Sequence, residues 1–144
     1  MPRTILLLLY DIALVCIALE DFKYRKIRNR YVIWILFLTL AGIFWIPEIT
    51  IQSRIVGMFA VSIPMTMLSW LRPGSFGGGD VKLVFASGAF LGNVLVIRGT
   101  VIGIFLAGIY SIYLLCKKKR CEHQIFPLGP FLSAGYLIFS FSLG

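Results

Sequence analysis

The chain has 144 residues, of which 59% are hydrophobic and 14% are charged, and its mean hydropathy is +0.92. Soluble domains carry about a quarter charged residues, so this composition excludes an ordinary soluble protein and indicates an integral membrane protein. A spanning helix needs roughly 20 apolar residues, and the length therefore suits one transmembrane domain, residues 1–144. The formal net charge of +8 has no soluble basic domain to carry it, and we expect no nucleic-acid partner.

Taken in chain order, the apolar runs fall at residues 4–20, 31–47, 53–71, 81–97, 99–116 and 125–143. These runs are long and unbroken and do not alternate with polar residues, which favours helices over strands. The predicted fold class is therefore all-α, a polytopic membrane protein with about six transmembrane helices.

The basic residues predict the orientation of these helices. The first loop, DFKYRKIRNR, and the fifth, KKKRCEH, hold most of the 14 Lys and Arg. Because cationic loops stay in the cytoplasm, we expect the odd-numbered loops inside the cell and both termini outside. The predicted location is the inner (cytoplasmic) membrane, with anionic lipid as a partner of the basic face.

Two of the six acids are predicted to meet at one membrane depth. Asp21 ends the first helix and Asp80 begins the fourth, both at the cytoplasmic face. Carboxylates about 3 Å apart share a proton. One of them can then act as base toward a water while the other polarises a carbonyl group. Such chemistry needs no metal or cofactor, and we expect neither.

Glycines precede the second of these acids, in the stretch GGGDVKL. Without side chains at Gly77, Gly78 and Gly79, a peptide backbone can approach Asp80, and the loop can adopt positive φ angles. The alternative for Asp80 is a structural one, because Asp is a good N-cap at the start of a helix.

Other features within the spans are expected to be structural. Asp11 lies in the first span, where a charge needs a partner, and we expect Arg54 or Arg98 to supply it. The pairs Gly88-x-x-x-Gly92 and Gly99-x-x-x-Gly103 are typical of closely packed helices. Three cysteines, Cys16, Cys116 and Cys121, form no C-x-x-C pair, which argues against a zinc site.

Three segments resemble the motifs of one family, the type IV prepilin peptidases, which are membrane aspartic proteases. GGGDVKL resembles their GxGD motif, and DFKYRKIRN is similar to their first motif, an aspartate followed by an aliphatic residue, a proline and an asparagine. Ile27 and Asn29 match that pattern, and Arg28 stands where the proline is usual. FPLGPFLSAG resembles the family's proline-glycine-proline segment before the last span.

The resemblance implies an intramembrane aspartic endopeptidase that removes the short basic leader of type IV pilin-like, Flp or pseudopilin precursors at the cytoplasmic face. It makes Asp21 and Asp80 the catalytic pair. It also implies a set of substrate-binding or supporting residues: Gly77, Gly78, Gly79, Lys82, Asn29, Pro127, Gly129 and Pro130. Pilus or secretion assembly machinery is an implied partner. Larger family members carry a cysteine-paired segment and methylate their product, so the resemblance is to the short, peptidase-only form.

Two other functions stay open at this stage. Small proton-coupled transporters also use few buried acids and glycine-broken helices. An inactive scaffold for a pilus assembly machine would share the same motifs.

Overall fold

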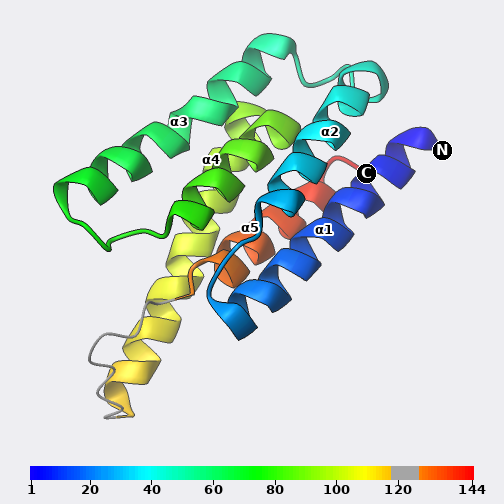
Figure 1. Ribbon diagram of the computed structural model, residues 1–144. Coiled ribbons are helices and arrows are strands. Elements are labelled where there is room, and N and C mark those ends of the chain that lie inside the picture. The colour runs from blue at the N-terminus through cyan, green and yellow to red at the C-terminus, as the bar shows by residue number, and fades with distance from the viewer. Residues whose placement is uncertain (118–126) are drawn as a thin grey trace.

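The computed structural model describes residues 1–117 and 127–144, and this part of the chain consists of helices and their connections (Figure 1). The helices are α1 (Pro2–Tyr24), α2 (Asn29–Trp45), α3 (Ile51–Leu71), α4 (Gly78–Cys116) and α5 (Gly129–Phe141). The all-α prediction is confirmed for these residues. Residues 118–126, which include Cys121, lie outside the described part.

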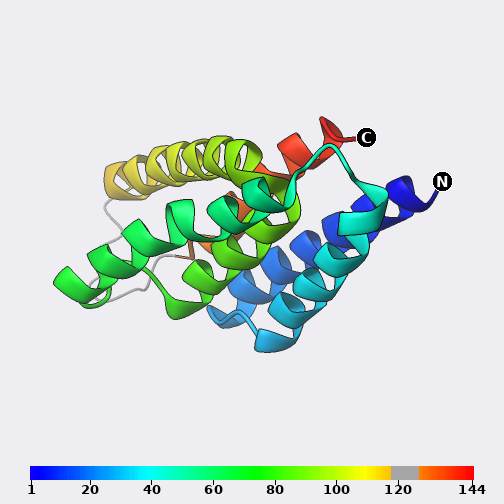
Figure 2. The ribbon, with the colours of Figure 1, turned by 90° about the horizontal axis from the view of Figure 1, so that it is seen from above.

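Helix α4 contains both the fourth and the fifth predicted run. The predicted interruption, between residues 97 and 99, was wrong, because the non-helical residue is Gly92, with φ 79° and ψ 176°. The helix turns back on itself there, and its second half returns toward the end at which α4 began (Figures 1 and 2). A Cβ at Gly92 would lie 2.7 Å from Ser53 Oγ and 2.8 Å from Ile49 Cγ2. Both the positive φ and this close approach require glycine. The number of membrane crossings stays a prediction.

Glycines bring the helices into close contact at all four predicted positions, Gly88, Gly92, Gly99 and Gly103. A Cβ at Gly88 would overlap the carbonyl oxygen of Gly57, so the backbones of α3 and α4 touch. On the other half of α4, a Cβ at Gly99 would lie 2.5 Å from the Tyr136 ring, and one at Gly103 would lie 2.9 Å from Leu132 Cα. Helix α5 therefore packs directly on these two glycines.

Both termini lie at the same end of the bundle (Figure 1). Arg3 forms hydrogen bonds of 2.7 and 2.9 Å with the Glu48 carboxylate and also donates to the Leu143 carbonyl. These contacts join the N-terminus, the α2–α3 connection and the C-terminus. Asp21 lies near the opposite end of α1. Which side of a membrane each end faces stays a prediction.

The buried guanidinium of Arg54 is bound by backbone carbonyls. Arg54 is 3% exposed. Its Nη1 donates to Ala89 and Phe90, both at 3.0 Å, and its Nη2 donates to Gly42 at 3.0 Å and Ile46 at 3.3 Å. These carbonyls belong to the last turn and C-cap of α2 and to the turn before Gly92, where helix ends carry partial negative charge.

The expected partner of Asp11 was therefore wrong. Within residues 1–117 and 127–144, neither Arg54 nor Arg98 forms an ion pair with Asp11. The physical reason is that carbonyl oxygens already bind both terminal nitrogens of Arg54, while Arg98 is exposed. One Asp11 oxygen is buried without a hydrogen-bond partner.

The outer surface of the bundle is strongly apolar. Large hydrophobic side chains are exposed on every helix, and Phe44 and Trp70 are each 83% exposed. Helices α3 and α4 are long and apolar enough to cross a membrane, and α2 and α5 are shorter apolar helices. This surface suits a lipid environment.

Candidate active site

Asp21 sits in the last turn of α1, and the start of α5 holds it in place. Its carboxylate is 5% exposed, and Oδ2 accepts a hydrogen bond of 3.1 Å from the backbone N–H of Gly129. A Cβ at Gly129 would overlap Oδ2 and lie 2.9 Å from Cγ of Asp21. Glycine at position 129 thus permits the contact, and the following Pro130 occupies a first-turn position where no N–H is needed.

Asp80 sits in the first turn of α4 and is 7% exposed. The N-cap of this helix is Gly77, and it makes no side-chain capping bond. The N-cap alternative for Asp80 is therefore wrong, because Asp80 is the third helical residue. The side chain remains available to face the pocket.

Two of the three glycines before Asp80, Gly77 and Gly79, serve close approach, and none of the three has an unusual backbone. Gly77 has φ −70° and ψ 141°, and the positive φ of this loop belongs to Gly74 instead. The expectation of positive φ at Gly77–Gly79 was wrong, because α4 already begins at Gly78. A Cβ at Gly77 would lie 3.2 Å from Asp80 Oδ2, and one at Gly79 would lie 3.0 Å from Ile27 Cβ. Gly78 faces open space.

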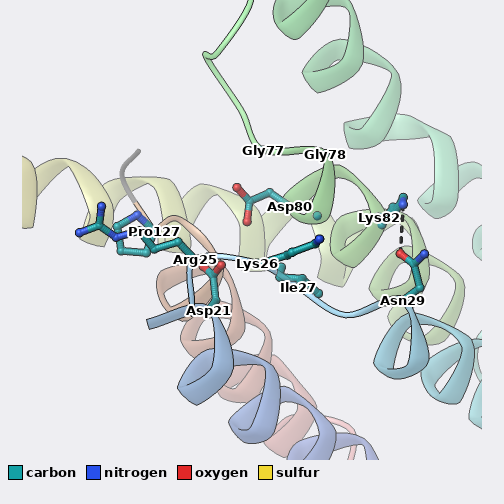
Figure 3. A pocket seen from close by; sticks show the side chains of 11 residues that line it. Asp21, Arg25, Lys26, Ile27, Asn29, Gly77, Gly78, Asp80, Lys82 and Pro127 are labelled. Atoms are coloured by element: carbon teal, nitrogen blue, oxygen red, sulfur yellow. Dashed lines mark hydrogen bonds between the residues drawn. The ribbon is translucent and has the colours of Figure 1, made fainter. Parts of the chain in front are cut away.

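The two carboxylates face each other across a cavity of about 360 Å³ (Figure 3). Its lining comes from the end of α1, the α1–α2 loop, the start of α4 and the segment before α5. These residues are Asp21, Arg25, Lys26, Ile27, Asn29, Gly77, Gly78, Gly79, Asp80, Lys82 and Pro127. Segments far apart in the sequence therefore meet at one site.

The α1–α2 loop is fixed to α4 by a polar contact and an apolar contact. Lys82 Nζ donates to Asn29 Oδ1 at 3.0 Å (Figure 3), and Ile27, 7% exposed, packs where Gly79 has no side chain. Lys82 thus bonds the residue that begins α2. These contacts hold the loop at one wall of the cavity.

The loop turns sharply after Asp21. Arg25 ends α1 in the left-handed conformation, with φ 52°, and its N–H donates to the Asp21 carbonyl at 2.8 Å. Arg28, where the motif usually has proline, has φ −75° and ψ 135°, which is a conformation that proline adopts. Glu20 forms ion pairs with two arginines of this segment. Its Oε2 lies 3.8 Å from Arg28 Nε, and its Oε1 lies 3.3 Å from Arg30 Nη2.

Most of the predicted site residues line the cavity. Gly129 and Pro130 do not line it, but Gly129 binds Asp21 from behind. Sequence reasoning missed Arg25 and Lys26, whose only signal was their place between Asp21 and Asn29. Within the described residues, no group of three or more His, Cys, Asp or Glu side chains is placed to hold a metal ion.

Comparison with known proteins identifies the family. The model of the type IV leader peptidase family matches residues 8–112, a range that includes Asp21 and Asp80. The chain is similar to the prepilin leader peptidase/N-methyltransferase of Bacillus subtilis, with 22% identity over 125 residues, covering 87% of this chain and 50% of the relative. It is also similar to the protein of the same name from Vibrio cholerae, with 28% identity over 128 residues, covering 85% of this chain and 50% of the relative.

The chain spans about half the length of these curated relatives. No solved structure matches it. The family model covers most of the chain, including both cavity acids, and the chain therefore belongs to the type IV leader peptidase family.

Proposed function

We propose that this chain is an intramembrane aspartic endopeptidase that removes the leader of prepilin-like precursors, with Asp21 and Asp80 as its catalytic pair. The observation that carries the proposal is the meeting of two buried carboxylates at one cavity, from the end of α1 and the start of α4 (Figure 3). Family membership supports the peptidase activity, and the curated relatives are named as prepilin leader peptidases.

The proposed reaction is general acid–base hydrolysis. A water attacks the scissile carbonyl carbon while one carboxylate takes a proton from that water. The other carboxylate, protonated, gives its proton to the carbonyl oxygen, and a tetrahedral intermediate forms. Its collapse breaks the C–N bond as a proton passes to the leaving nitrogen. The Gly129 N–H occupies one side of Asp21 and fixes its orientation.

The cavity has room for a substrate backbone beside the acids. Gly78 faces open space, so an extended peptide can lie along the first turn of α4 next to Asp80. The basic α1–α2 loop supports a cytoplasmic location of the site, and the apolar outer surface supports embedding in the membrane. We propose a precursor with a basic leader and an apolar helix as substrate, and peptidase activity without methyl transfer.

The test is cleavage of such a precursor by purified protein in lipid vesicles. Asp21→Asn and Asp80→Asn should each lower kcat by about a thousandfold or more, because each removes one member of an acid–base pair. Asp11→Asn is the matched control, since Asp11 lies in the same helix as Asp21 but outside the cavity, and it should keep most of the activity. Near wild-type cleavage by either cavity variant would overturn the proposal and favour a transporter.

A further inference from the structure

A long furrow separates two consecutive helices, α2 and α3. Helix α2 packs on α1 and α4, and α3 packs on α4, but the two are not close neighbours. The space between them holds two adjoining hollows, of about 440 and 470 Å³, which share Leu36 in their linings. We refer to both together as the α2–α3 furrow. The apolar residues of its wall on α3 are Ile51, Ile55, Met58, Phe59, Ile63 and Met67, and Arg54, Ser62 and Thr66 also line it.

The furrow runs along most of the length of a membrane span and ends beside the cavity that holds the acids. From Ile51 to Met67 a helix rises about 24 Å, against about 30 Å for the hydrocarbon core of a bilayer. A stripe of α4, Val81, Phe85 and Ala89, lies along it. Lys82 lines both the furrow and the Asp21–Asp80 cavity. The furrow and the cavity therefore adjoin at Lys82.

The surface of the furrow suits a helix. Three hydroxyl residues line it, and each donates to the backbone of its own helix: Thr39 to Ile35, Ser62 to Met58 and Thr66 to Ser62. The furrow thus offers small side chains with satisfied hydroxyls beside apolar ones. Helix–helix interfaces in membranes are built from such residues, because they allow backbones to approach closely.

The acids also favour one direction for such a helix. The cavity that holds Asp21 and Asp80 adjoins one end of the furrow, at Lys82, which lines both. An apolar helix with its N-terminus at this end presents the preceding extended residues to the two acids. A leader that precedes an apolar helix has this polarity.

From this geometry we infer that the α2–α3 furrow is the docking site for the apolar helix of the substrate, which it holds while the leader boundary enters the cavity. The inference rests on the proposed function, since it names the place where that substrate binds. It commits to the substrate helix as occupant; a lipid chain or a second copy of the protein are other outcomes of the test.

Adjacent positions on α3 give a matched pair of variants. Met67 lines the furrow and is 59% exposed, whereas Leu68 is 50% exposed and is absent from the furrow lining. Met67→Trp should raise KM for a helix-bearing precursor about tenfold with little change in kcat, because it fills space needed only for docking. Leu68→Trp should leave both constants unchanged. Both variants should cut a soluble peptide of the leader boundary, which lacks the helix, at the wild-type rate.

Photo-crosslinking gives a second measurement that does not depend on turnover. A photoreactive residue at position 67 in the Asp80→Asn variant should capture the helix of the uncut precursor, and one at position 68 should not. Equal KM values for Met67→Trp and Leu68→Trp, or crosslinks from position 67 only to lipid or to a second copy, would overturn the docking site. Failure of the wild-type protein to cut either substrate would instead overturn the proposed function.

Discussion

Two buried charged centres of this protein lie in contrasting surroundings. Arg54 has four backbone carbonyls around its guanidinium, supplied by α2 and α4. Asp21 and Asp80 are buried to a similar degree but face a cavity, and Asp21 has one described hydrogen-bond donor, Gly129. Burial alone therefore does not mark a reactive group. The difference is that the carboxylates of Asp21 and Asp80 have lone pairs that face the cavity, where a substrate and a water can bind.

Of the substitutions considered, replacement of Arg54 is expected to lower the stability of the protein most. Arg54→Met removes the charged donors of four buried carbonyls, of which Gly42 and Ile46 keep a backbone donor. The free energy of unfolding should fall by about 4 kcal/mol. Thermal unfolding in detergent measures this loss, and the folded fraction should cleave precursor normally. Arg98→Met, at an exposed position, should change stability by less than about 0.5 kcal/mol. A stable Arg54→Met protein without activity would break the comparison.

The largest effect on activity outside the acids is expected at Gly129. In Gly129→Ala the new methyl group meets the Asp21 carboxylate, so the carboxylate must move. A displacement of about 1 Å costs on the order of a hundredfold in rate, and kcat of precursor cleavage should fall by that factor. Gly108→Ala is the control, because nothing lies within 4 Å of that position. It should keep full activity, and equal kcat for the two variants would contradict the assigned role of Gly129.

A smaller effect is expected at the α1–α2 loop, which forms one wall of the cavity. Lys82→Met and Asn29→Ala each remove the 3.0 Å bond between α4 and the α1–α2 loop. An exposed hydrogen bond contributes about 1 kcal/mol, so kcat/KM should fall about fivefold in either variant. Since both variants break the same bond, the double variant should be no worse than the singles. Additive losses would show that Lys82 and Asn29 act separately.

The smallest effect is expected at Arg28, on the rim of the site. Arg28→Pro fits the observed φ of −75° and should raise stability by about 0.4–1 kcal/mol through the unfolded state. It gives up a contact of 3.8 Å between exposed Arg28 and Glu20, which contributes little. Chemical unfolding measures the gain. A loss of stability would mean that the Arg28 N–H or the preceding Ile27 tolerates no proline.

Much of this architecture could be predicted from the sequence. Apolar runs predicted the helix ends to within a few residues, apart from the break within α4. The distribution of basic residues predicted that Asp21 and Asp80 lie at one end of the bundle. The glycine and proline motifs pointed to the segments that line the cavity. Each of these features depends on a short stretch of sequence, or on the fact that successive loops of a helical bundle lie at alternate ends.

The remaining features depend on contacts between distant segments. Hydropathy does not distinguish a turn at Gly92 from a turn near Arg98. The turn lies at Gly92 because Ile49 and Ser53 approach its backbone so closely that only glycine fits. The sequence suggested Arg54 as a partner for Asp11, since no local pattern shows that its carbonyl partners come from two other helices. No sequence rule indicated that Arg25 would take a left-handed conformation at the end of α1.

The most direct test of the central claim compares Asp21→Asn, Asp80→Asn and the double variant in one single-turnover cleavage assay. Two groups that act as one unit lose their function together. The account predicts that each single variant and the double variant fall to the same residual rate, about a thousandfold or more below wild type. A double variant slower than either single by the product of their separate losses would contradict it, because the two acids would then act independently.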